Sequence, residues 1–161
     1  MMYAKILSYT IFILLSSLCW SLPTDKDQPI NLTANSADMD EGKEISVYKG
    51  NVVVLQGSMR LMANEVTVFH PNRKAQKIIA TGAVKFSQKK LNGEMIRAKA
   101  NKANFFVTSE LLELTGDASL TQSGDTMKSD RITYDRVKHK VKAGNVAKGK
   151  ERVKITIQPK D

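Results

Sequence analysis

A short segment of glycine, alternating apolar residues and glutamine recurs along this chain of 161 residues. Each copy begins with glycine, has apolar residues two and four positions later and glutamine at the sixth; the copies are Gly50–Gln56, Gly82–Gln88 and Gly116–Gln122, with a partial fourth at Gly144–Val146. The glycines are 32, 34 and 28 residues apart. A period of this length is typical of repeat architectures, in which each unit completes its core against the next.

A second motif lies inside each repeat and has its own spacing. Its copies are Ala34–Met39, Ala63–Val68, Ala100–Phe105 and Ser129–Tyr134, at intervals of 29, 37 and 29 residues. The longer middle interval contains five extra residues around Leu91–Glu94. We expect this insertion to lengthen a surface loop and to leave the repeat intact.

Local periodicity predicts an all-β chain. Apolar and polar residues alternate with a period of two in 52–56, 66–69, 138–143 and 153–158, and Val, Ile, Thr, Tyr and Phe dominate these runs. This pattern is typical of strands. Glycine-containing pairs between the runs favour turns; they are Lys49-Gly50, Thr81-Gly82, Asn92-Gly93, Thr115-Gly116, Ser123-Gly124 and Ala143-Gly144.

Aligning the repeats places apolar residues in four columns. The columns are Val52, Val84 and Ala118; Val54, Phe86 and Leu120; Ala37, Val66, Ala103 and Ile132; and Met39, Val68, Phe105 and Tyr134. Because strand side chains alternate between faces, each column is expected on one buried side of a folded sheet. The columns are either a plain core or an apolar trough that holds a long apolar ligand.

The first residues have the pattern of a secretory signal peptide. Lys5 precedes an apolar run from Ile6 to Trp20, and polar sequence follows Pro23. We expect residues 1–22 to be removed, which leaves one domain at 23–161; an uncleaved membrane anchor is the alternative. Lipid attachment at Cys19 is disfavoured because Leu18 stands where a lipobox needs a small residue.

Removal of the signal peptide also removes the only cysteine. The remaining chain then has no disulfide, and its two histidines belong to no zinc, iron–sulfur or haem pattern. We therefore expect no metal and no cofactor.

The positive charge lies mainly at the C-terminal end. Residues 23–135 hold 15 basic and 14 acidic side chains, whereas residues 136–161 hold nine basic and two acidic ones. A basic end of this kind suits an anionic lipid surface, an acidic partner or a solvated edge strand. Nucleic acid is disfavoured because the segment lacks aromatic residues for base stacking.

Several segments in order resemble the OstA-like family of periplasmic lipopolysaccharide transport proteins. They are Asp27–Thr33, Gly50–Gln56, Leu114–Gln122 and Ser129–Tyr134, and the resemblance extends to the closing stretch Gly149–Lys154. It implies a single elongated, slightly twisted, open β-jelly roll whose apolar interior holds the acyl chains of lipid A. It also implies head-to-tail self-association and a bridge from an LptC-like inner-membrane partner to the N-terminal domain of an LptD-like outer-membrane partner.

Carrying the family's lining positions onto this chain gives Ile30 and Leu32 at the N-terminal mouth, followed by Val54, Gln56, Phe86, Phe105 and Val107. Together with the columns, the predicted groove consists of Ile30, Leu32, Met39, Val52, Val54, Gln56, Val66, Val68, Val84, Phe86, Phe105, Val107, Leu120, Ile132 and Tyr134.

The repeated glutamines share the inward parity of the apolar columns. Since a buried amide needs hydrogen-bond partners, we interpret Gln56, Gln88 and Gln122 as bonded or hydrated rim residues, or as side chains that close turns. His70 and His139 are expected at loop and edge positions.

Two other classes of function stay open. An exported enzyme on a repeat scaffold would need converging acid and base groups, and the carboxylates here are scattered, so we expect no enzyme. A structural or adhesive β-solenoid with a dry core is the stronger rival. Whether the protein is a lipid carrier or a structural solenoid, the strands around Ile30–Thr33 and Val153–Ile157 are the expected edges for strand addition.

Overall fold

The computed structural model describes residues 25–144 and 152–159. The expected signal peptide and part of the basic C-terminal end lie outside these residues. Within them, no helix is long and apolar enough to cross a membrane.

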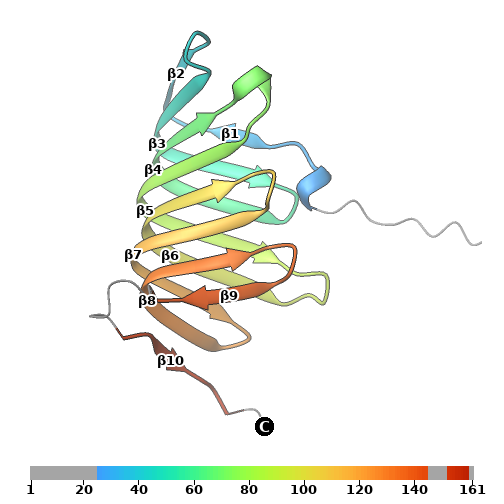
Figure 1. Ribbon diagram of the computed structural model, residues 1–161, viewed down its shortest axis with the longest axis vertical. Coiled ribbons are helices and arrows are strands. Elements are labelled where there is room, and N and C mark those ends of the chain that lie inside the picture. Colours follow the sequence, from blue (N-terminus) through green and yellow to red (C-terminus); the bar gives the residue numbers. More distant parts are fainter. Residues whose placement is uncertain (1–24, 145–151, 160–161) are drawn as a thin grey trace, which may run out of the picture.

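The described residues form one antiparallel sheet whose strands stack along the long axis of the molecule, with β2 at one end and β10 at the other (Figure 1). The strand order is β1-β3-β4-β5-β6-β7-β8-β10, with β2 also paired to β3 and β9 to β8. The elements are η1 (Asp25–Asp27), β1 (Asn31–Thr33), β2 (Ser36–Asp40), β3 (Ile45–Gln56), β4 (Met59–Phe69), η2 (Pro71–Arg73), β5 (Lys77–Lys89), β6 (Met95–Phe106), β7 (Leu111–Gln122), β8 (Asp125–Asp135), β9 (Lys140–Ala143) and β10 (Lys154–Thr156). The prediction of an open all-β fold is confirmed.

The prediction of turns at Gly50, Gly82 and Gly116 is wrong. These glycines lie inside β3, β5 and β7, where the register shifts between Lys49 and Val52 and at the equivalent positions of the other two strands. Each glycine has a φ of 76 to 78°, and the next residue is also left-handed. Sequence alone cannot distinguish this bulge from a turn, because both need a glycine with positive φ.

Each of these glycines packs against an asparagine from the second motif. A Cβ atom on Gly82 would lie 2.7 Å from the Nδ2 atom of Asn64, and Asn35 and Asn101 stand in the same way against Gly50 and Gly116. The two repeated motifs are therefore two sides of one contact, in which the asparagine of one unit covers the glycine bulge of the next.

The bulges bend the long strands and divide the sheet into two facing walls. Wall A comprises β2, 45–49, 65–69, 77–81, 102–106, 111–115, 131–135 and β9, and wall B comprises β1, 52–56, 59–63, 84–89, 95–100, 118–122, 125–129 and β10. In Figure 1 the bends lie on the left and the turns between consecutive long strands, from β3 to β8, lie on the right. We call the side of the turns the mouth.

The inner faces of both walls form one hydrophobic core. Of the four predicted columns, all members on the long strands are buried except Val68, which is half-buried. The prediction is wrong for Ala37 and Met39: both are exposed, and Met39 has 64% of its surface accessible. They lie on β2, a short strand that pairs only with β3 at the end of the sheet. The insertion at 90–94 is the expected loop, between β5 and β6.

We predict that Gly82→Ala lowers stability more than Gly93→Ala. Both glycines have a positive φ, of 78° and 84°, so alanine costs about 1–2 kcal/mol of backbone strain at either position. Only at Gly82 does the new methyl group also overlap Asn64, which adds about 1–3 kcal/mol, whereas nothing lies within 4 Å of the corresponding point at Gly93. Urea unfolding of both variants measures the difference, and equal losses would show that the Gly–Asn contact contributes nothing.

Candidate functional site

The interior between the two walls contains most of the predicted groove residues. Val52, Val54, Gln56, Val66, Val84, Phe86, Phe105, Leu120, Ile132 and Tyr134 are all buried. Ile30, Leu32, Val68 and Val107 are half-buried and pack against this core. Met39 is the one predicted residue that the structure places outside it.

The interior is filled by its own side chains. Its 21 apolar residues are each at most 6% exposed, and Phe86 of wall B contacts Tyr134 of wall A in an edge-to-face arrangement with ring centres 6.3 Å apart. Burial raises the pKa of Tyr134 to about 12, so its hydroxyl stays protonated. A long apolar ligand would therefore enter only if the walls move apart.

Further apolar residues of this interior were not in the predicted set. They are Met59, Leu61, Ala63, Ile78, Ala80, Ile96, Ala98, Ala100, Ala103, Leu112, Leu114 and Ala118. Only Ala103 and Ala118 belonged to the aligned columns. The alternation of the full strands contains the signal for the others, since every second residue of 59–63 and 96–100 is apolar.

The repeated glutamines lie where the strands of wall B reach the mouth. The amide of Gln56 donates to the carbonyl oxygens of Lys26 and Gln28, at 3.3 Å each. The Gln88 amide donates to Asp25 at 2.8 Å, and that of Gln122 donates to Glu94 at 3.3 Å. Of the interpretations given for these glutamines, the hydrogen-bonded one agrees with the structure.

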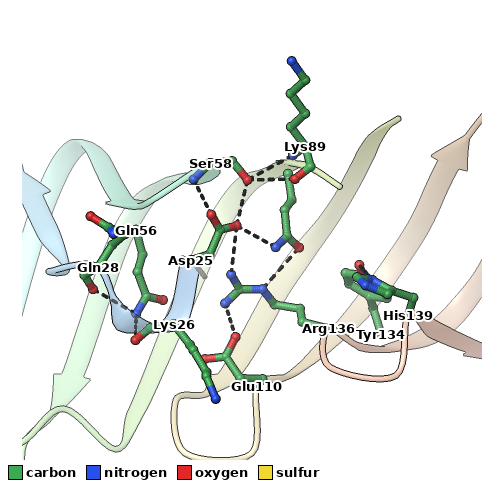
Figure 2. Close-up of polar contacts among 11 residues, drawn as sticks. Asp25, Lys26, Gln28, Gln56, Ser58, Lys89, Glu110, Tyr134, Arg136 and His139 are labelled. Carbon is green, nitrogen blue, oxygen red and sulfur yellow. Dashed lines mark hydrogen bonds and ion pairs between the residues drawn. The ribbon is translucent and has the colours of Figure 1, made fainter. Parts of the chain in front are cut away.

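A buried arginine, which the sequence analysis did not single out, joins the two walls at the mouth (Figure 2). Arg136 follows β8 and is only 4% exposed. Its guanidinium lies 2.8 Å from the carboxylate of Glu110, from the β6–β7 turn of wall A, and its Nε atom donates to Gln88 of wall B at 3.2 Å. It also lies 5.1 Å from the ring centre of Phe105, within range of a cation–π interaction.

The N-terminal segment crosses the mouth through the side chain of Asp25. One oxygen of Asp25 accepts a hydrogen bond from the backbone N–H of Ser58 at 2.7 Å. The other accepts from the Ser58 hydroxyl at 2.7 Å and from Gln88, and lies 3.5 Å from Arg136. A Cβ atom on Gly57 would overlap Asp25, so this glycine makes room for the segment.

These contacts form what we call the clasp: Asp25, Ser58, Gln88, Glu110 and Arg136. It joins the β3–β4 turn and the end of β5, in wall B, to two turns of wall A through one buried cation. The terminal nitrogens of Arg136 contact carboxylates without making aligned hydrogen bonds, so the attraction there is mainly ionic. The clasp holds the mouth closed.

The environment of the clasp shifts the pKa values of its charged groups. Burial pushes the pKa of Asp25 upward, but hydrogen bonds from Ser58 and Gln88 and the charge of Arg136 outweigh it, so the pKa is lowered. Burial raises the pKa of Glu110, although Arg136 opposes this shift. Burial also lowers the pKa of Arg136, which its carboxylate partners counteract. Both carboxylates therefore stabilise the buried positive charge of the guanidinium.

A hollow of about 290 Å³ lies beside the clasp. Its lining combines the clasp residues Asp25, Gln88, Glu110 and Arg136 with the exposed apolar side chains of Leu91 and Val137. The hollow thus places charged and polar groups beside apolar ones at the edge of the closed interior. Among the described residues, no cluster of histidine, cysteine and carboxylate side chains could hold a metal ion.

A folded open sheet with one apolar interior and a polar mouth is an open β-jelly roll. A family model described as "LptA/(LptD N-terminal domain) LPS transport protein" matches residues 31–140. The chain belongs to this family, and the predicted resemblance is confirmed.

The chain is also similar to individual proteins over most of its length. It is 36% identical to the lipopolysaccharide export system protein LptA of Haemophilus influenzae, over 96% of this chain and 91% of that protein. It is 32% identical to LptH of Pseudomonas aeruginosa, over 90% and 87%. The crystal structure of LptH, described as the periplasmic component of a lipopolysaccharide transport device, superimposes with a TM-score of 0.79 and 30% identity, over 85% of this chain and 100% of that one.

We predict that Asp25→Asn removes a stabilising contribution that depends on pH. Because folding lowers the pKa of Asp25, its carboxylate stabilises the fold fully above the unfolded pKa of about 3.9, and this contribution is lost as the pH falls through the lower folded pKa. The variant should be about 1–3 kcal/mol less stable at neutral pH, and the difference should shrink below about pH 4.

Urea unfolding at a series of pH values checks this prediction. Ser58→Ala provides a comparison, because it removes the hydrogen bond from the Ser58 hydroxyl to Asp25 and keeps the one from the Ser58 backbone N–H. Because the lost hydrogen bond lowers the pKa of Asp25, this pKa should be higher in Ser58→Ala. The pH at which the stability of Ser58→Ala falls should therefore move upward, toward the unfolded pKa of Asp25. A stability difference between wild type and Asp25→Asn that is the same at every pH would contradict the assignment.

Proposed function

We propose that this chain is a periplasmic lipopolysaccharide transport protein that binds the acyl chains of lipid A between its two walls. The observation that carries the proposal is the continuous apolar interior of one open sheet, closed only at its mouth by polar contacts. Membership of the LptA/(LptD N-terminal domain) family supports it. In this role the protein needs no chemical reaction, cofactor or metal, because apolar contacts alone retain the ligand.

Loading requires the walls to part, because their side chains fill the interior. Each methylene group buried contributes about 0.8 kcal/mol, so a chain of about twelve carbons would gain on the order of 9 kcal/mol in an empty groove. In this protein the acyl chain must first replace contacts that the two walls make with each other. The net affinity is correspondingly lower, which suits a carrier that must pass its ligand on.

The predicted lining residues keep their proposed role, with the exception of Met39. We assign the acyl-chain contacts to the buried residues of both walls and to Ile30, Leu32, Val68 and Val107 at the margins of the core. The headgroup would stay at the mouth, where release of Arg136 from Gln88 and Asp25 allows the walls to separate. Met39 is exposed on β2, so we exclude it from the lining.

Photo-crosslinking from neighbouring positions of opposite parity tests the groove. A photoreactive amino acid at Phe86, which faces the interior, should crosslink lipopolysaccharide, whereas one at Lys85 or Ser87, on the outer face, should crosslink at least tenfold less. The yield is measured by gel mobility and immunoblotting for the lipid.

Equal crosslinking from both faces would contradict an interior site. Absence of crosslinking at Val54, Phe86 and Phe105 would favour the alternative of a structural β-solenoid. The observation that supports this alternative is that the interior is filled by its own apolar side chains.

We also propose that copies of the chain associate head to tail. The sheet ends in β1 and β2 on one side and in β9 and β10 on the other, and within the described residues each of these strands pairs on one edge only. The free edges offer unpaired N–H and C=O groups for strand addition. Such a stack would continue the apolar interior from one copy to the next, which supplies a neighbour of similar affinity for the ligand.

The ends of the stack would pair with related sheets in the two membranes. The matching family model covers both LptA and the N-terminal domain of LptD, which supports an LptD-like partner at the outer membrane. By the same edge pairing, an LptC-like protein is the proposed inner-membrane partner. The cleaved signal peptide at residues 1–22 and the single domain at 23–161 complete this proposal.

Truncation before Arg152 tests the edge model. It removes β10, whose residues 154–156 pair with 126–128 of β8 at the end of wall B. We expect the truncated chain to keep its β-sheet signal in circular dichroism but to show at least several-fold weaker association in concentration-dependent light scattering. Unchanged association would contradict a role for this edge.

A further inference from the structure

The outer face of wall B carries two rows of side chains that contain no carboxylate. The strand register aligns one row as Thr33, Val53, Met62, Lys85, Lys99, Ser119, Lys128 and Lys154, and the next as Asn31, Leu55, Arg60, Ser87, Arg97, Thr121, Thr126 and Thr156. We call the six cations in these rows the cationic strip: Arg60, Lys85, Arg97, Lys99, Lys128 and Lys154.

All six side chains of the strip are exposed, and none forms an ion pair with any residue in 25–144 or 152–159. Moreover, Lys85 lies directly opposite Lys99, and Lys128 lies directly opposite Lys154. Like charges opposite each other on neighbouring strands destabilise a sheet. The two lysine pairs thus carry an electrostatic cost that no ion pair among the described residues offsets.

The outer face of wall A is arranged differently. It contains both cations and carboxylates, and two of the cations are paired: Lys49 with Glu65 at 3.7 Å, and Arg131 with Glu113 at 2.8 Å. The same chain therefore has one outer face that mixes cations with carboxylates and one with two rows that carry cations and no carboxylate. Solubility alone explains a mixed charged surface, but it does not explain this difference between the two faces.

Two shallow hollows lie along the strip. One, of about 440 Å³, is lined by Arg60, Lys85, Arg97 and Lys99, with hydroxyl groups of Ser87 and Thr121 between them. The other, of about 640 Å³, is lined by Lys128, Lys154 and Arg152 and also by Asp117 and Asp130 at the bend of the sheet. Cations interspersed with hydroxyl donors offer several positions for phosphate oxygens.

The composition of the strip distinguishes among anionic partners. The central parts of protein–protein interfaces are depleted in lysine and enriched in aromatic residues, but the strip has four lysines and no aromatic residue. Single-stranded nucleic acid also needs aromatic stacking platforms. The phosphates of a lipid held in the groove would lie at the mouth, where we placed its headgroup, and not on the outer face of wall B. A flat layer of phosphate headgroups matches the strip best, since Lys and Arg side chains near an anionic lipid surface are attracted to it electrostatically.

We propose that the outer face of wall B binds the surface of an anionic phospholipid bilayer through the cationic strip. This interaction is independent of the interior groove and goes beyond the proposed transport function. It places one wall against the headgroup layer and leaves the mouth and both sheet edges free. The unfavourable lysine pairs persist because phosphate groups neutralise them at the membrane.

Vesicle cosedimentation tests the proposal with the full chain after removal of residues 1–22. The wild-type protein should bind vesicles of phosphatidylcholine mixed with phosphatidylglycerol, and should bind at least tenfold less to phosphatidylcholine alone. Binding should fall as salt is raised, because the attraction is electrostatic. No preference for the anionic vesicles would overturn the proposal.

Two charge-matched double variants locate the binding surface. Lys85→Glu with Lys99→Glu changes the strip, and Lys102→Glu with Lys142→Glu makes the same change in net charge on the outer face of wall A. The strip variant should lose at least tenfold in affinity for the anionic vesicles, and the control should change much less. Equal losses would overturn the proposal in favour of a general effect of net charge.

The single variant Lys85→Glu separates binding from folding. It converts the Lys85–Lys99 pair into an opposite-charge pair, so its melting temperature should equal or exceed that of the wild type while its vesicle binding falls. Weaker binding together with a lower melting temperature would overturn the assignment. Lipopolysaccharide crosslinking at Phe86 should be unchanged in this variant, so the outcome is distinct from any failure of the groove proposal.

Discussion

The contact between a glycine bulge and an asparagine is the constraint on which the rest of this structure depends. At Gly50, Gly82 and Gly116 a long strand turns from one wall into the other, and Asn35, Asn64 and Asn101 occupy the space that a side chain on these glycines would need. Without the bends, the apolar face of the sheet would be open to solvent on one side. With them, the sheet folds onto itself and a single sheet provides both halves of its own core.

The interior therefore depends on the whole sheet, and the middle of each long strand, at the bend, differs in its role from the strand's two ends, at the mouth. At the bend, the backbone is continuous and the walls cannot separate. At the mouth, only side chains connect the walls, and the clasp around Arg136 is their main polar link among the described residues. Any separation of the walls would therefore be confined to the side of the mouth.

The charges of the two outer faces follow from the same geometry. Because each long strand contributes to both walls, its two halves are free to differ in outward-facing residues. Lys49 and Arg131 have carboxylate partners on wall A, whereas Lys85 and Lys128 on wall B have lysines opposite them. Groove, mouth and outer face thus have separate chemistry on one continuous set of strands.

The sequence by itself determined the strands, the repeat and the apolar columns, because period-two alternation and recurring motifs are local patterns. It also placed Phe86, Phe105 and Tyr134 correctly in the interior and the glutamines at bonded positions. Only the tertiary structure decided that Gly82 forms a bulge and not a turn, since both conformations need the same residue. It also decided that Met39 is exposed, and that Arg136, Glu110 and Asp25 meet. Those three residues come from segments far apart in sequence, and only the bending of the sheet brings the segments together.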